Sequence, residues 1–180
     1  GDVLIGEAIP AAFELEIPSP PSFAQALAAQ AHSPALDPHI ENVVSGGLGF
    51  HPVCFCCGAD VPKGVGLRVF AAPVTGFEGV AAAWQPDAAF RDDAGVLPTS
   101  VVWAALDCPG QFAYLADDIR TGLLGRMTAK ILAPVVGDVF VITGWRIAVE
   151  GKKYFAGTAL FDSNGRCCAY SKQVWIGRRD

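Results

Sequence analysis

GVLPTSVVWAALDCPGQFAYL occupies residues 95–115 and predicts a long helix in the middle of the chain. Pro98 stands near its start, where a missing N–H costs little, and the hydroxyl residues that follow can cap exposed amides. One side of this helix is apolar at helical spacing, at Leu97, Val101, Ala104, Cys108, Phe112 and Leu115. Such a stripe needs an apolar surface to cover it, so we expect the rest of the chain to supply a sheet.

Strand-like segments flank this helix on both sides. Alternating and β-branched stretches predict strands over residues 66–74, 78–85, 126–131, 138–149, 154–162 and 166–176. Ser163-Asn164-Gly165 predicts a hairpin turn between the last two, because Asn-Gly readily adopts the positive φ that such turns require. We expect the strands after the helix to form a four-strand meander. The order of elements predicts an α+β fold in which an antiparallel sheet wraps around one long central helix.

Residues 1–50 have a different character. Val3-Leu4-Ile5 predicts a short strand, and residues 13–17 alternate like a half-buried edge strand. Ser22 caps a predicted helix that runs to Ala31, and residues 32–50 predict a loop because proline, glycine and polar residues are frequent there. We therefore predict an N-terminal arm over residues 1–50 and one domain over residues 51–180.

The chain is apolar for its size. Of its 180 residues, 52% are hydrophobic and 17% are charged, and the mean hydropathy is +0.36. Soluble domains carry about 25% charged residues, so we expect apolar surface to be hidden in a homo-oligomer or a ligand tunnel. The longest charge-free stretch, residues 17–36, contains four prolines, which excludes a membrane-spanning helix there.

The charge distribution argues against nucleic acid as a partner. Residues 1–62 contain seven acidic residues and no Lys or Arg, whereas residues 63–180 contain thirteen basic and eleven acidic residues. Binding to nucleic acid needs a clustered basic face, but the basic residues here are scattered and the isoelectric point is near 5.1. We therefore expect a small-molecule ligand.

Six cysteines occur in three groups: Cys54, Cys56 and Cys57, then Cys108, then Cys167 and Cys168. They are too few and too bunched for a secreted disulfide scaffold, and the first residues do not resemble a secretory signal, so we expect a cytoplasmic location. His51 and the first cysteine group suggest zinc ligands, but the sequence has one Cys-x-x-Cys pair and no second pair at usable spacing. We therefore expect a packed cluster of thiols and no metal site.

A second face of the central helix carries polar and aromatic residues: Ser100, Trp103, Asp107, Gln111 and Tyr114. Asp107 is the carboxylate in an otherwise apolar stretch, which fits either a functional group or a surface charge bonded to water or to a partner chain. Pro109 removes a helical hydrogen bond and clashes with the carbonyl of Ala105, so it predicts a kink beside this aspartate.

Two of these stretches carry a family resemblance. Residues 95–107, followed by Met127-Thr128-Ala129-Lys130-Ile131-Leu132-Ala133-Pro134-Val135-Val136-Gly137-Asp138, resemble the hotdog-fold acyl-CoA thioesterase superfamily. Cys54-Phe55-Cys56-Cys57-Gly58, leading to Gly66-Leu67-Arg68-Val69, resembles the lead-in to the first strand in many of its members. The resemblance covers residues 50–178 and implies the hotdog fold. Within it, residues 1–50 are either an arm or the remnant of a preceding hotdog half.

The resemblance implies a thioester hydrolase in which Asp107 matches the helical carboxylate that acts as general base or nucleophile. Backbone amides near Ser100 and Val101, at the start of the helix, are then the expected oxyanion donors, and Gln111 orients water or binds substrate. Trp103 is expected either to narrow the pocket or to belong to a dimer interface. The sequence departs from the family pattern at Leu97-Pro98-Thr99-Ser100, where one major subgroup has His-Gly-Gly.

The expected substrate is an acyl-CoA or a carrier-bound acyl thioester, and no cofactor is expected beyond the coenzyme A of the substrate. Arg126 and Lys130 are candidate contacts for its phosphates, and Tyr114 is a further candidate substrate contact. The alternative is a non-catalytic hotdog module that binds acyl-CoA or acts as a structural partner. A hydratase is disfavoured, because the three histidines all precede the helix.

Overall fold

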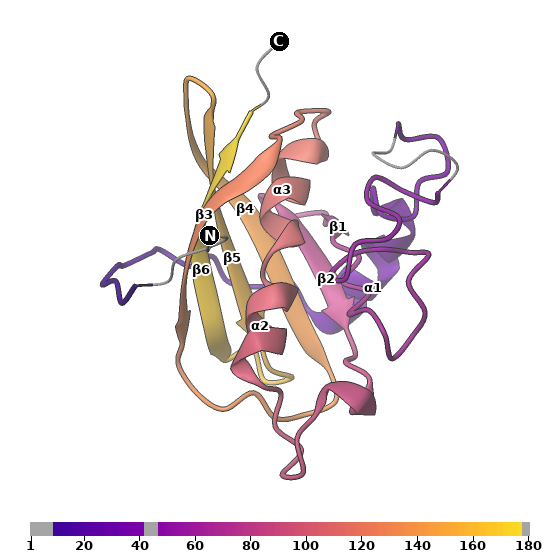
Figure 1. Cartoon of the computed structure of the whole chain (residues 1–180), viewed down its shortest axis with the longest axis vertical. Helices are drawn as coiled ribbons and strands as arrows, with labels where there is room; N and C mark the ends of the chain where they lie inside the picture. Colours follow the sequence, from indigo (N-terminus) through magenta and orange to yellow (C-terminus); the bar gives the residue numbers. More distant parts are fainter. Residues whose placement is uncertain (1–8, 42–46, 178–180) are drawn as a thin grey trace, which may run out of the picture.

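The computed structural model describes residues 9–41 and 47–177, which form a six-stranded antiparallel sheet with helices on both of its faces (Figure 1). The strands lie in the order β1-β2-β4-β5-β6-β3. Their bounds are β1 (Ala72–Pro73), β2 (Val80–Trp84), β3 (Leu123–Ile131), β4 (Phe140–Glu150), β5 (Lys153–Phe161) and β6 (Cys167–Ile176). The helical elements are α1 (Phe23–Ala29), η1 (Gln30–His32), η2 (Ala88–Phe90), α2 (Thr99–Ala105) and α3 (Cys108–Leu115).

The central helix lies across one face of the sheet, as expected, but it is interrupted. Helix α2 ends at Ala105 and α3 begins at Cys108, so the kink predicted from Pro109 is a break at Leu106 and Asp107. The main core lies between these helices and the sheet, and its largest fully buried side chains include Trp84, Phe112, Phe140 and Leu160. Gly144 of β4 permits close contact, because a Cβ there would overlap the carbonyl oxygen of Pro109.

The opposite face of the sheet is covered by the part of the chain before residue 30. Helix α1 packs against β2 and β4 through a small cluster around Ala26. Phe13, Leu15 and Ile17 pack on Trp145 and Tyr170, so residues 13–17 are an extended segment on this face and not an edge strand. The predicted strand Val3-Leu4-Ile5 lies outside the described residues. The division between residues 1–50 and 51–180 stays a prediction.

Two strand predictions were wrong. The expected four-strand meander is a three-strand meander of β4, β5 and β6, because β3 pairs with β6 at the far edge and not with β4. Of the predicted strand over residues 66–74, β1 alone forms. Residues 67 and 69 instead donate their amides to the carbonyls of Phe55 and Cys56, so the cysteine loop takes the place of a neighbouring strand.

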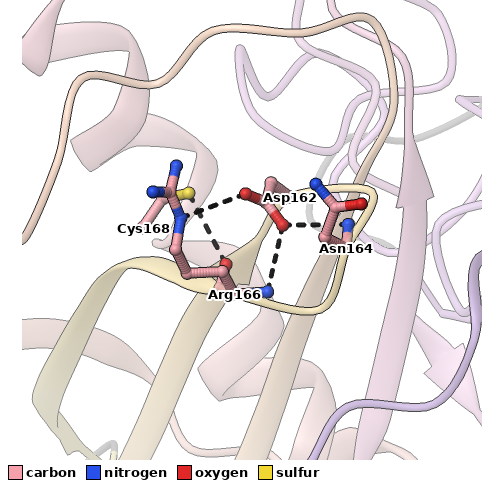
Figure 2. Close-up of polar contacts among 4 residues, drawn as sticks. All are labelled: Asp162, Asn164, Arg166 and Cys168. Atoms are coloured by element: carbon pink, nitrogen blue, oxygen red, sulfur yellow. Dashed lines mark hydrogen bonds and ion pairs between the residues drawn. The ribbon is translucent and has the colours of Figure 1, made fainter.

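The hairpin between β5 and β6 forms at the predicted Asn-Gly turn. Figure 2 shows the carboxylate of Asp162 accepting hydrogen bonds from the amides of Asn164 and Arg166, at 2.9 and 3.0 Å. The Arg166 side chain donates to the other oxygen of Asp162 at 3.2 Å, and Gly165 adopts a φ of 77°. Among the described residues, no helix has the length and apolar character needed to cross a membrane.

Ser22→Ala is expected to lower the free energy of unfolding by about 1 kcal/mol, which lowers the melting temperature by roughly 2–4 °C. The Ser22 hydroxyl accepts from the Gln25 amide at 3.2 Å, and the Gln25 side chain accepts from the Ser22 amide at 2.9 Å, so the substitution breaks a complete capping box. Thermal unfolding followed by circular dichroism measures the change. Ser19→Ala, at an exposed position just before the helix, is the control; equal shifts for both variants would contradict the capping role.

Candidate active site

The helix break is held by a glutamine from the sheet. Pro109 has no N–H to donate, and the carbonyls of Leu106 and Asp107 are turned towards β6. There the Gln173 side chain donates to both, at 2.7 and 3.1 Å, and its own oxygen accepts from the Trp175 indole at 2.8 Å. Gln173 is fully buried, and Gly110 leaves it space, because a Cβ at that position would overlap its side-chain oxygen. The amide of Gln173 therefore fixes the backbone on which Asp107 stands.

The break places Asp107 in the wall of a groove of about 1140 Å³. Trp103, Ala104 and Asp107 form its helical side, residues 124–129 of β3 form the facing side, and residues 9–13 close one end. Phe155, Lys172 and Val174 also line it. The groove therefore combines one carboxylate with apolar walls and two cationic side chains, Arg126 and Lys172.

Asp107 has an unusual electrostatic environment. Its Oδ1 atom is buried and has no hydrogen-bond partner among the described residues. Burial raises the pKa of Asp107 from 3.8 to about 6, and the charge of the nearby Cys54 thiolate acts in the same direction. A carboxylate in this state is a stronger base than an exposed aspartate.

A group of thiols lies behind the break. The sulfur atoms of Cys54, Cys57 and Cys108 all lie within 4.8 Å of one another, and those of Cys54 and Cys108 are 3.6 Å apart. Hydrogen bonds from Cys108 and then Cys57 hold the pKa of Cys54 well below its usual value. The thiol of Cys56 lies 3.9 Å from the carbonyl oxygen of Ala105. In a regular helix this carbonyl would accept from the amide of residue 109, but Pro109 has no N–H to donate.

Comparison with solved structures finds the same arrangement of sheet and helix in other proteins. A protein described as belonging to the thioesterase superfamily aligns with a TM-score of 0.57 at 14% identity, over 62% of this chain and 55% of its own. This chain therefore spans about half the length of that relative. A candidate thioesterase related to phenylacetic acid degradation, from Ralstonia eutropha JMP134, aligns with a TM-score of 0.56 at 14% identity, over 71% and 93% of the two chains.

The fold is the hotdog fold. A hypothetical thioesterase from Streptococcus pneumoniae TIGR4, solved with coenzyme A, also aligns, with a TM-score of 0.51 at 13% identity over 57% of this chain and 85% of its own. No protein-family model matches the chain. No curated protein matches it either. The similarity between this chain and these proteins is thus a similarity of structure. At 13–14% sequence identity it shows the fold and not the reaction.

Three of the predicted site residues meet in the groove of this hotdog domain: Trp103, Asp107 and Arg126. Ser100 is exposed in the first turn of α2, and the Val101 amide donates to the carbonyl of Pro98 at 3.0 Å. The amide of Val101 is therefore engaged within the helix. Lys130 lies farther along β3 and is not part of the groove wall.

The other two predicted residues are buried. The Gln111 side chain bonds to His51 Nε2 and to the carbonyl of Gly122, both at 3.0 Å, so it ties two loops to the hotdog helix. Tyr114 is fully buried, and its hydroxyl lies 2.8 and 2.7 Å from the carbonyls of Ala148 and Phe155. The predicted polar face is therefore split: its first half borders the groove, and the structure places its second half in the core.

Proposed function

We propose that this protein is a thioesterase that hydrolyses an acyl-CoA or a carrier-bound acyl thioester, with Asp107 as the catalytic carboxylate. The observation that carries the proposal is the buried oxygen of Asp107, which has no hydrogen-bond partner in the part of the chain that the structure describes, in the wall of a large, mostly apolar groove. An acyl chain suits the apolar walls, and Arg126 and Lys172 suit the phosphates of coenzyme A. The hotdog fold and the coenzyme A in the S. pneumoniae structure support the same substrate class.

In the proposed reaction, the Asp107 carboxylate accepts a proton from a water molecule as the water oxygen attacks the thioester carbonyl. The tetrahedral intermediate then collapses, the C–S bond breaks, and the thiolate leaves and takes up the proton. Backbone amides stabilise the developing oxyanion, since they can donate hydrogen bonds without reorganisation. The first amides of α2, including that of Ser100, have no acceptor within their own helix and are the proposed donors.

A second copy of the chain completes this arrangement. Ser100 precedes Asp107 by seven residues, so at 1.5 Å per residue the two lie about 10 Å apart in one protomer, too far to act on one carbonyl. Within residues 9–41 and 47–177, strand β3 pairs on one side only, with β6, and its other edge includes Leu123, which is 76% exposed. A long unpaired edge with apolar side chains favours pairing. We therefore propose a homodimer along β3, in which the base and the oxyanion donors come from different protomers.

The proposed setting is the cytoplasm and the proposed reaction needs no further cofactor. The six cysteines are all free thiols in this structure, a state that a reducing compartment maintains.

Release of free thiol from short, long and aromatic acyl-CoAs tests the proposal directly. Hydrolysis of at least one class by the wild type, lost in Asp107→Asn, is the expected result. The alternative is a module that binds acyl-CoA without hydrolysing it. Binding of acyl-CoA, measured by calorimetry, without thiol release from any member of the panel would favour that alternative.

Arg126→Ala is expected to raise KM for acyl-CoA about fivefold, with little change in kcat, since a charge-assisted contact at an exposed site contributes about 1 kcal/mol. Arg126 is exposed and lines the groove, and on β3 its side chain lies on the face away from the helix, since its neighbour Met127 is the residue that packs into the core on the helix side. Steady-state kinetics against coenzyme A and pantetheine thioesters measures the effect, which should vanish for the pantetheine substrate because it lacks the nucleotide phosphates. Lys153→Ala, at the start of β5 outside the groove, is the control; an equal rise in KM there would contradict the assignment.

A further inference from the structure

Cys54, Cys57 and Cys108 come from two distant parts of the chain. The first two stand in the loop that precedes β1, and Cys108 is the first residue of α3. Cys57 and Cys108 are 1% and 4% exposed, and Cys54 is half-buried. Of the other three cysteines, Cys56 stands in the same loop but outside this group, and Cys167 and Cys168 belong to β6.

The spacing of the sulfur atoms suits a shared metal ion. Two thiolates that each lie about 2.3 Å from a tetrahedral zinc ion are about 3.8 Å apart. The sulfur atoms of Cys54 and Cys108 are 3.6 Å apart, and the third sulfur lies within 4.8 Å of both. A disulfide would require a separation of about 2.05 Å. The three sulfurs therefore surround a space of the size that one zinc ion takes.

The backbone of the loop is built for close approach of its two cysteines. Cys54 and Cys57 have Cys-x-x-Cys spacing and are followed by Gly58, whose amide donates to the carbonyl of Cys54 at 2.8 Å. A Cβ at Gly58 would lie 2.5 Å from that carbonyl oxygen and 2.6 Å from the Cys54 amide nitrogen, so a larger residue would open the turn. This turn presents both sulfurs on one side, towards the start of α3.

We propose that Cys54, Cys57 and Cys108 bind one zinc ion, which fastens the cysteine loop to the hotdog helix beside its break. Soft thiolate ligands select zinc among the common divalent ions. Cys56, whose thiol also interacts with Cys108, or a water molecule supplies the fourth ligand. Three thiolates outweigh the charge of the ion, which makes it a poor Lewis acid, so the site is structural. This inference does not rest on the proposed thioesterase activity.

The metal content of the wild-type chain is the first test. Protein purified with a phosphine reductant, reconstituted with zinc and desalted should hold about one zinc ion per chain by mass spectrometry of the metal. Replacing zinc with Co²⁺ should give the thiolate-to-cobalt charge-transfer band and the intense visible bands of tetrahedral cobalt. In peptide mapping, zinc should protect Cys54, Cys57 and Cys108 from alkylation, and a chelator should remove that protection.

Single variants assign the ligands. Cys108→Ser and Cys57→Ser should each weaken Co²⁺ binding by more than about 100-fold, because loss of a ligand costs more than the 10–100-fold typical of outer-shell groups. Cys167→Ser, which removes a half-buried thiol on β6, is the matched control and should bind Co²⁺ as the wild type does. Far-ultraviolet circular dichroism shows whether each variant is folded. If a variant is unfolded, protection of the same cysteine from alkylation in the zinc-bound wild type assigns the ligand instead.

Three results would overturn the proposal. The first is a folded, reduced wild type that retains no zinc after reconstitution. The second is equal Co²⁺ affinity in Cys108→Ser and Cys167→Ser. The third is a reduced wild type in which Cys54, Cys57 and Cys108 are alkylated equally fast with and without zinc.

Discussion

Asp107→Asn is expected to lower kcat for thioester hydrolysis by about 10²–10⁴-fold, the usual contribution of a general base. The amide has nearly the shape of the carboxylate but cannot take a proton from water. The substitution also leaves the hydrogen bond between Gln173 and the main-chain carbonyl of residue 107 in place. Because the lost interaction exists in the transition state, kcat should fall while KM stays near its wild-type value.

The stability of this variant separates a catalytic role from a structural one. One oxygen of the Asp107 carboxylate is buried without a hydrogen-bond partner among the described residues, which is costly to the folded state, so Asp107→Asn should unfold at the same or a higher temperature than the wild type. Asp93→Asn, in the exposed turn before the helix, makes the same chemical change outside the groove and should retain full activity. Retained turnover in Asp107→Asn, or equal losses in both variants, would contradict the assignment of Asp107.

Local sequence features predicted the elements near the site. The apolar stripe and Pro98 placed the helix over residues 98–115, Pro109 placed the kink, and the Asn-Gly pair placed the last hairpin turn. These features act over a few residues, through side-chain periodicity or through the φ angles that proline and glycine permit. The residues that decide such features are all present in the local sequence.

Features that depend on distant pairing could not be predicted in this way. Strand β3 has the alternation of a meander strand, and nothing within it tells that its partner is β6, some 40 residues later, and not β4. Cys108 looks like one more apolar residue of the helical stripe until the fold brings it to Cys54. For this reason the absence of a second Cys-x-x-Cys pair did not exclude a third thiol in the cluster, which Cys108 contributes alone.

Gln173 was missed although its sequence carried a signal. Its strand also holds Ser171 and Lys172 but is otherwise apolar or aromatic, and an amide there needs partners if it is buried. The sequence cannot name those partners, because they are two main-chain carbonyls at a helix break more than 60 residues earlier. A polar residue at an inward position of a strand is therefore a pointer to irregular backbone on the element packed against it.

Gln173→Leu is expected to lower the free energy of unfolding by about 3 kcal/mol or more, because each buried polar group left without a partner costs about 1–3 kcal/mol. The groups that lose a partner are the carbonyls of Leu106 and Asp107 and the indole N–H of Trp175, and the Asp107 carbonyl keeps a long hydrogen bond from the Gly110 amide, at 3.4 Å. For a chain of this length, the melting temperature should fall by roughly 6–12 °C. Thermal unfolding measures the loss, with Gln85→Leu at an exposed position as the matched control.

Kinetics tests whether Gln173 also positions Asp107. At a temperature where Gln173→Leu is folded, its kcat for the acyl-CoA that the wild type hydrolyses should fall while KM changes little, because the glutamine holds the base from behind and does not itself line the groove. Adding Asp107→Asn to Gln173→Leu should then lower kcat by less than it does in the wild type, since both changes act on one group. Additive losses in the double variant would show that the glutamine stabilises the fold without orienting the carboxylate.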